Sequence, residues 1–437
     1  RWTGRKPGRK PGIRKSFGFL NQNIHSVAFT SCGTQDEDER RIFERSNMSV
    51  FLLITRNFPP LLGGMERLNQ HLLQELEQEY DVYLVGPHGA ADHVSHPERV
   101  ITCPSAPISA FLTCAAIQAV RLARRYRPDL IIAGSGVNAP LAWLAAKASG
   151  APWLVYLHGL DLVVDHIAYQ RIFLPIIRRA DAWLVNSHAT AQLAIAAGLD
   201  ANRLSVLHPG VAIPDTLPSD EKVVAWRDKQ GFGARPLLLS VGRLTRRKGL
   251  REFVLHALPA ILAAHPETLL VVVGEEPGSA LTSASVGLDA LREAARQSDT
   301  QQSLKMLGTL SDEELGLAYK AASVLVFPVL DIPGDMEGFG MVAIEAAAHG
   351  LPTVAFAVGG VPDAISDGCS GYLIPPGDYP SMVKKVIEQL SGQSDANHLA
   401  ACRAFAADFS WPKFGIGLRQ FCQKLVLRSD ALEKTRS

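Results

Sequence analysis

Short apolar runs alternate with amphipathic stretches along the chain from Met48 onward. In the first half, the stretches 65–80 and 111–128 have the apolar spacing of helices and lie between the apolar runs. This order predicts βαβ units and a parallel sheet, and continuous apolarity predicts central strands covered by helices on both faces. The predicted strands span 49–55, 81–87, 129–134, 152–159 and 182–187.

The pattern stops at the proline-rich segment 208–222, which we interpret as a linker, and then resumes. The second set of predicted strands spans 236–242, 268–274, 304–308, 323–329 and 352–358. A chain of 437 residues is too long for one core, because single cores stop growing near ~250–300 residues. We therefore predict an α/β protein with two Rossmann-like, doubly wound domains and a last helix, Trp411 to Glu433, that crosses back onto the first domain. The predicted domains are 48–215 and 216–410, preceded by an extension (1–47) and followed by the crossover helix and tail (411–437).

The charge is distributed unevenly along the chain. Residues 1–47 carry 10 Lys/Arg and 5 Asp/Glu, whereas the remainder carries 34 and 38, a net charge of −4. A mildly acidic body argues against nucleic-acid binding, which needs a basic surface. We interpret residues 1–47 as a disordered or mis-assigned extension; a basic tail that binds an acidic partner is the alternative.

The cysteines indicate a reducing compartment. The six cysteines form no CxxC pair and have no histidine at ligand spacing, which argues against a zinc site and a disulfide framework. No apolar run reaches the ~18–20 residues of a membrane span. We therefore expect a cytoplasmic protein.

The segment 327–377 contains the strongest candidate chemistry. After a predicted strand come Asp331, Asp335 and Glu337, and then the sequence Gly-Phe-Gly leads into a predicted helix, 341–349. Glycines at a helix start let an anion approach the free N–H groups and the positive end of the helix dipole. Glu337 lies before that helix and Glu345 just over one turn inside it, and a carboxylate can accept hydrogen bonds from the diol of a ribose. The spacing suits a nucleotide sugar; the alternative is a turn followed by a surface glutamate.

Three further segments support a phosphate ligand less strongly. The segment 240–250 places Arg243 and Lys248 directly after a predicted strand, where paired cations can neutralise a diphosphate. Gly63 and Gly64 precede the first long helix and offer a second glycine-led helix start. His158 ends a predicted strand, where it could contact a sugar hydroxyl, although a histidine in this position is often structural.

A dinucleotide-dependent dehydrogenase is disfavoured. The stretch 134–139 formally matches G-x-G-x-x-A, but the next predicted strand ends in His158 and not in the acidic residue that binds a ribose 2′-hydroxyl. A non-catalytic protein that binds sugar nucleotides stays open as the alternative from another functional class.

Together these motifs resemble the retaining GT-B glycosyltransferases of family 4, which include bacterial mannosyltransferases of the phosphatidylinositol and lipopolysaccharide pathways. The resemblance extends from about residue 49 to 409–414, and its specific part is the E-x7-E pair of Glu337 and Glu345. It implies two domains facing a central cleft, a sugar transferred from a nucleotide diphosphate to a lipid-linked or glycan acceptor, and no metal or other cofactor. GDP-mannose is the expected donor, and a UDP-hexose is the alternative.

The resemblance also implies roles for individual residues. Arg243 and Lys248 would bind the diphosphate, Glu337 the transferred sugar and Glu345 the ribose. His158 would lie beside the reacting sugar. The remaining donor-binding residues would be the glycines that close over the phosphates, the glycine-rich loop and a residue near the base: Gly63, Gly64, Gly338, Phe339, Gly340 and Leu310.

Two positions depart from the family pattern. Many relatives have glutamate where this chain has Asp161, and the segment 274–278 reads GEEPG where Gly-x-Gly-Pro is common. Two stretches, 121–127 and 171–179, combine basic and apolar residues. They are typical either of peripheral contact with an anionic membrane, on the inner face of the plasma membrane, or of ordinary amphipathic helices.

Overall fold

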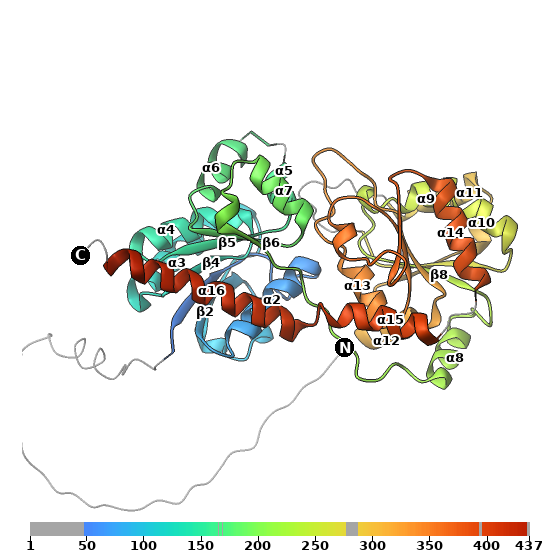
Figure 1. Cartoon of the computed structure of the whole chain (residues 1–437), viewed down its shortest axis with the longest axis horizontal. Coiled ribbons are helices and arrows are strands. Elements are labelled where there is room, and N and C mark those ends of the chain that lie inside the picture. The colour runs from blue at the N-terminus through green and yellow to red at the C-terminus, as the bar shows by residue number, and fades with distance from the viewer. Residues whose placement is uncertain (1–47, 165, 168, 277–286, 393–395, 435–437) are drawn as a thin grey trace, which may run out of the picture. The chain divides into compact units, whose positions relative to one another are not determined.

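Two parallel sheets organise the chain (Figure 1). The computed structural model describes residues 48–437 except 165, 168, 277–286, 393–395 and 435–437, so the predicted extension 1–47 lies outside the described residues. In the described part the sheets have seven and six strands, and every paired strand runs parallel to its neighbour. The predicted architecture of two doubly wound domains is confirmed.

The first sheet has the strand order β3-β2-β1-β4-β5-β6-β7. Its strands are β1 (Val50–Ile54), β2 (Asp81–Pro87), β3 (Val100–Cys103), β4 (Leu130–Ala133), β5 (Trp153–Leu157), β6 (Ala182–Val185) and β7 (Leu204–Val206). Its helices are α2 (Gly64–Leu76), α3 (Ile108–Tyr126), α4 (Ala139–Ser149), α5 (Leu160–Val163), α6 (Leu174–Ile177) and α7 (His188–Ala196).

The second sheet has the order β10-β9-β8-β11-β12-β13. Its strands are β8 (Leu237–Val241), β9 (Leu269–Val273), β10 (Leu304–Gly308), β11 (Val324–Phe327), β12 (Thr353–Phe356) and β13 (Gly371–Ile374). Its helices are α8 (Asp220–Lys229), α9 (Leu250–His256), α10 (Leu258–Ala264), α11 (Leu288–Gln297), α12 (Asp312–Ala321), α13 (Met341–Ala348), α14 (Tyr379–Ser391) and α15 (Ala396–Ala407).

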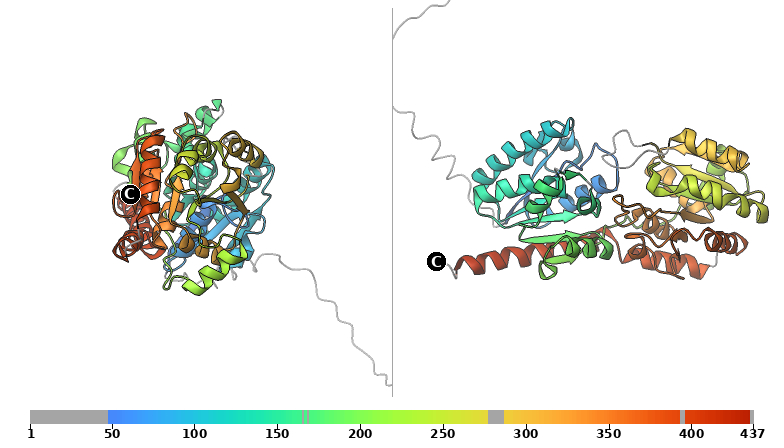
Figure 2. Two further views of the ribbon diagram at one scale, coloured as in Figure 1. Left: turned by 90° about the vertical axis from the view of Figure 1, so that its right-hand side faces the viewer. Right: turned by 90° about the horizontal axis from the view of Figure 1, so that it is seen from above.

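The central strands are buried on both faces, as their continuous apolarity predicts. In β1, Phe51 and Leu53 belong to one core cluster and Leu52 and Ile54 to another, and Figure 2 shows helices on both faces of each sheet. Burying one such side chain stabilises the fold by ~1.5–3 kcal/mol. No helix in the described ranges combines the length and apolarity that crossing a bilayer requires.

The sequence pattern missed the strands β3, β7 and β13. Each lies at an edge of its sheet, is three or four residues long and is only partly buried. Edge strands need little apolar surface, so their sequences carry a weak signal. The predicted linker also extends too far, because Ser219 caps α8 and the helix begins at Asp220. The predicted domain boundary at 215/216 lies between β7 and α8 and stays a prediction.

The predicted crossover helix is confirmed as α16 (Trp411–Lys434), which packs beside α2 (Figure 1). Trp411, Phe414 and Leu418 enter the core cluster that contains Phe51. The chain crosses between the sheets twice, and the two crossings pair where the Val211 N–H donates to the Phe409 carbonyl at 2.7 Å. Gly210 is required there, because a Cβ atom would lie 2.3 Å from the Trp411 ring.

The contact between α2 and α16 predicts a pH-dependent stability. The His71 ring stacks on Trp411 at 3.8 Å between centroids, and burial, with Arg67 nearby, lowers the pKa of His71 to about 4. The His71 imidazole binds a proton more tightly in the unfolded chain than in the folded protein. The stabilisation of the fold by neutral His71 is therefore present above pH ~6.5 and is lost as the pH falls toward about 4.

We therefore expect the free energy of unfolding of the wild type to fall by ~1–3 kcal/mol more than that of His71→Phe across this pH range. Denaturant unfolding of both proteins at pH 7 and pH 4.5 measures the difference. The same substitution at the half-exposed His96 is the control. Parallel pH profiles for the wild type and His71→Phe would contradict the assignment.

Candidate active site

The predicted cations lie on a tightly packed turn that directly follows β8. A Cβ atom on Gly274, which has a φ of +136°, would lie 2.0 Å from the Gly242 carbonyl oxygen, so the loops after β8 and β9 approach closely. Arg243 follows this turn with an exposed side chain. Lys248 ends the 3-10 helix Arg246–Lys248, and only 18% of its side chain is exposed. Both residues line a pocket at the strand end.

A buried ionic network joins this turn to the loop after β11. Glu337 Oε2 accepts hydrogen bonds from Lys248 Nζ at 2.9 Å and from Arg247 Nε at 3.1 Å. Arg247 also donates to Asp335. The side chains of all four residues are at most 18% exposed. The sequence singled out Glu337 and Lys248, and the structure places them in direct contact.

The network keeps Glu337 ionised. Burial alone would raise the pKa of its carboxyl group, but Lys248 and Arg247 outweigh burial and lower that pKa below its usual value. Burial also lowers the pKa of the Lys248 ammonium group, against the opposing effect of Glu337. Each group therefore depends on its partner for its charge, and removing one partner leaves a buried charge uncompensated.

Glu345 lies in the second turn of α13 and contacts both domains. Its Oε1 accepts a hydrogen bond from Arg67 Nη1 at 2.7 Å, and its Oε2 accepts one from the Tyr319 hydroxyl at 2.9 Å. Tyr319 is buried, and burial and Glu345 raise the pKa of its phenol, so the hydroxyl keeps its proton and donates. Arg67 is 46% exposed, which makes its ion pair the weaker of the two contacts.

The two glycine-led helix starts face each other. A Cβ atom on Gly64, the first residue of α2, would lie 3.2 Å from the sulfur of Met341, the first residue of α13. Gly340 precedes α13 with a φ of +98°, a conformation that favours glycine. The two helix starts therefore lie close together, whereas the predicted role of Gly63 and Gly64 toward phosphates stays a prediction.

The glycine-rich loop packs closely on the first domain. A Cβ atom on Gly338 would lie 2.4 Å from the His158 carbonyl oxygen and 2.6 Å from Asn186 Nδ2. Phe339 is buried and its ring stacks on His208. Only glycine can therefore occupy position 338 in this arrangement.

His158 is more constrained than its position at a strand end indicated. The side chain is buried, and Nε2 donates to the Gly134 carbonyl at 2.9 Å. Asp161 accepts from the backbone N–H groups of His158 at 2.9 Å and Gly136 at 3.1 Å, and burial raises the pKa of its carboxyl group. Asp161 therefore ties two strand-end loops together. The catalytic role of His158 stays a prediction.

Leu310 lies in the loop after β10. It packs, half buried, against the second domain's core. Its neighbour Thr309 donates to Glu275 Oε1 at 3.2 Å, which connects the loops after β9 and β10. The wall of the pocket beside Arg243 includes neither Leu310 nor the two glutamates.

Four further residues contact the predicted carboxylates or their partners, and the sequence pattern gave none of them a role, although Asp335 stands in the predicted loop. Arg247 and Asp335 had visible signals, because one lies inside the basic turn and the other two residues before Glu337. The sequence gave no signal that would have identified Arg67 or Tyr319. Arg67 lies 278 residues from Glu345, and only the fold brings the two together.

Two family models match the chain. "Glycosyl transferases group 1" matches residues 224–404, and "Glycosyltransferase Family 4" matches residues 62–213. Between them the matches cover all strands of the second sheet and all strands of the first sheet except β1.

Curated relatives with similar sequences are sugar transferases. The GDP-mannose-dependent alpha-(1-6)-phosphatidylinositol monomannoside mannosyltransferase of Mycolicibacterium smegmatis is 28% identical over 84% of this chain and 97% of its own length. The D-inositol 3-phosphate glycosyltransferase of Streptomyces scabiei is 29% identical, and the match covers 65% of each chain.

Solved structures show a similar fold. HepE of Anabaena in complex with UDP-glucose has a TM-score of 0.71 at 19% identity, over 86% of this chain and 99% of that one. Sucrose-phosphate synthase of Thermosynechococcus elongatus has a TM-score of 0.71 at 22% identity, over 87% of this chain and all of that one.

Proposed function

The chain belongs to the family 4 glycosyltransferases of GT-B fold and is an enzyme of that class, and from this premise we propose that it transfers mannose from GDP-mannose with retention of configuration. The observation that carries the proposal is the ion pair between Lys248 and Glu337 beside the exposed Arg243. In this proposal Glu337, in the loop after β11, binds the sugar, and the two cations of the turn after β8 bind the phosphates.

The diphosphate is bound by Arg243 and Lys248 in this proposal. Arg243 is exposed and forms no ion pair with any other described residue. Lys248 has three N–H donors and directs one to Glu337, so the others can reach a phosphate oxygen. The glycine-led start of α13 adds backbone N–H groups and a positive dipole end. No metal ion has a role in this proposal, as the family resemblance implies.

The ribose diol binds to Glu345 by exchange with Arg67. Tyr319 holds one carboxylate oxygen and the exposed Arg67 holds the other. A half-exposed ion pair contributes only ~0–1 kcal/mol, so two hydrogen bonds from a diol can replace it. Leu310 lies toward the base, and Gly63 and Gly64 close over the phosphates.

The transfer itself is a substitution at the anomeric carbon. The bond from that carbon to the phosphate oxygen breaks, and the nucleoside diphosphate leaves with the bonding electron pair. The acceptor oxygen forms its bond to the anomeric carbon on the same face and gives its proton to the departing phosphate oxygen. Glu337 is held by two cations and binds the sugar, so it does not act as a covalent nucleophile.

We propose a lipid-linked or glycan acceptor in the synthesis of cell-envelope glycoconjugates, such as lipopolysaccharide, on the cytoplasmic side. The mannosyltransferase of Mycolicibacterium smegmatis acts on a phosphatidylinositol mannoside and supports a lipid acceptor. Exposed Ile117, Arg121 and Arg124 on α3 and Leu144 on the adjacent α4 would meet an anionic membrane surface.

A panel of nucleotide sugars tests the donor. We expect GDP-mannose to stabilise the protein most, by about 2.7 kcal/mol at 100 times its Kd, and to be turned over with release of GDP. HepE binds UDP-glucose, so UDP-hexoses form the second arm of the panel. A larger stabilisation and turnover with a UDP-hexose would reassign the donor. Absence of binding and turnover with every nucleotide sugar would overturn the proposal.

A further inference from the structure

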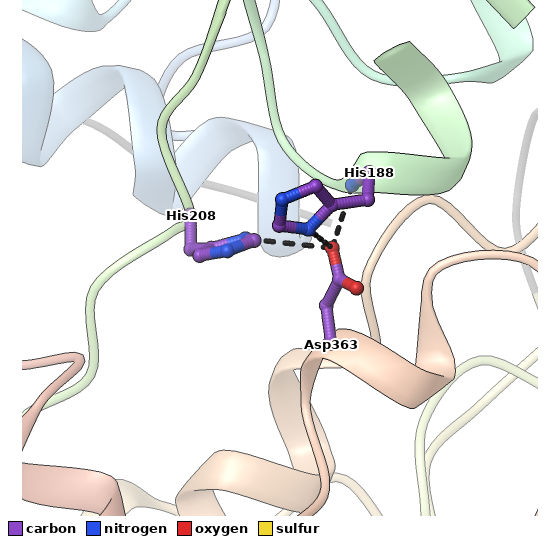
Figure 3. Close-up of side chains that lie close together, drawn as sticks. All are labelled: His188, His208 and Asp363. Carbon is purple, nitrogen blue, oxygen red and sulfur yellow. Dashed lines mark hydrogen bonds and ion pairs between the residues drawn. The ribbon is translucent and has the colours of Figure 1, made fainter. Parts of the chain in front are cut away.

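Two histidines and an aspartate from separate elements meet outside the candidate active site (Figure 3). His188 is the first residue of α7, His208 lies just after β7, and Asp363 ends the 3-10 helix Val361–Asp363. One potential ligand atom from each residue lies within 4.8 Å of the other two. The residues are 20 and 155 positions apart, so the local spacing that argued against zinc could not reveal them.

The distances within this cluster suit a small divalent cation. His188 Nδ1 lies 3.1 Å and His208 Nδ1 3.8 Å from Asp363 Oδ2. Ligand atoms around tetrahedral zinc, with bonds of ~2.0–2.1 Å, lie roughly 3.3 Å from each other. Small side-chain rotations would therefore bring the three atoms into a coordination sphere, and two imidazoles with one carboxylate are a typical ligand set for zinc.

The surroundings orient the ligands and leave one side open. The His188 backbone N–H donates to Asp363 Oδ2 at 2.6 Å, which fixes the carboxylate beside the start of α7. His208 is packed between Phe339 and Phe409, which orients its ring. The His188 side chain is 70% exposed, which leaves room for a water ligand.

We propose that His188, His208 and Asp363 form a binding site for one divalent transition-metal ion, with Zn²⁺ as the best match, that clamps the first domain to the second. Each histidine binds through Nδ1, and its ring proton then resides on Nε2. For His208 this replaces the hydrogen bond from Nδ1 to the Asn186 carbonyl, 3.1 Å away. Because His208 stacks on Phe339, the ion would also hold the glycine-rich loop in place.

Calorimetric titration of the metal-free full chain with Zn²⁺, without any nucleotide sugar, tests this site. We expect one saturable site, and at least tenfold weaker binding in both His188→Ala and Asp363→Asn. The matched control is His96→Ala, since His96 also pairs with an acidic residue, Glu98, on the surface. This control should bind zinc like the wild type.

Titration with Co²⁺ separates this site from the cysteines. Binding by nitrogen and oxygen ligands gives visible d–d absorption without a thiolate charge-transfer band. The absence of saturable binding, an unchanged affinity in both site variants, or a thiolate band that accompanies binding would overturn the proposal. Sugar transfer is not the readout, so failure here leaves the proposed function untouched.

Discussion

Replacing Glu337 by glutamine is expected to lower kcat/KM for sugar transfer by about 10²–10³-fold. Glutamine keeps the size of the side chain but removes the charge that holds Lys248 and Arg247. Burial already lowers the pKa of Lys248, so its ammonium group becomes harder to maintain without Glu337. In the proposed assignment the variant therefore affects both the residue that binds the sugar and the cation that binds the diphosphate. Steady-state kinetics with varied donor measures the loss.

A change in folding must be separated from a change in chemistry, because removing one partner of a buried ion pair can destabilise a protein by ~3–5 kcal/mol. Thermal unfolding of the variant shows whether it is folded at the assay temperature. Asp331→Asn is the matched control, since Asp331 is an exposed carboxylate in the same loop, and its activity should match the wild type. Near-wild-type turnover by a folded Glu337→Gln variant would remove Glu337 from the site.

Replacing Arg243 by alanine is expected to weaken donor binding by about 10–100-fold, because a charged hydrogen bond contributes ~1.5–3 kcal/mol. Arg243 is exposed and outside the ion pairs of the network, so the fold should be unaffected. Titration of a non-reactive donor analogue measures the affinity directly. The affinity for the acceptor should not change.

The neighbouring turn provides the control for this variant. Arg246 is also exposed and lies three residues further along the same basic turn, so Arg246→Ala alters the net charge equally. Its donor affinity should stay within about twofold of the wild type. Equal losses in both variants would mean that the turn acts through general charge and that Arg243 makes no specific contact.

The sequence was sufficient where a residue's environment is set by its immediate neighbours. Continuous apolar runs predicted the central strands of both sheets, because these strands are buried on both faces. Gly340 was recognised at the start of α13, where its φ of +98° favours glycine. The half-exposed edge strands β3 and β7 lack such a signal.

The sequence was insufficient where the environment comes from distant parts of the chain. It identified Glu337 and Lys248 but not their contact, and it gave no partner for Glu345. His158 illustrates the same limit, because only the fold shows that its ring contacts the Gly134 carbonyl. Pairs of this kind depend on which strand ends the topology brings to the same edge of a sheet.

The proposed function requires the loops after β8 and β11 to bind a nucleoside diphosphate sugar. A crystal structure of the full chain with the nucleoside diphosphate of its preferred donor tests it most directly. We expect phosphate oxygens within hydrogen-bonding distance of Arg243 and Lys248, and a ribose diol on Glu345 in place of Arg67. A diphosphate bound away from both cations, with the ion pair between Arg67 and Glu345 intact, would contradict it.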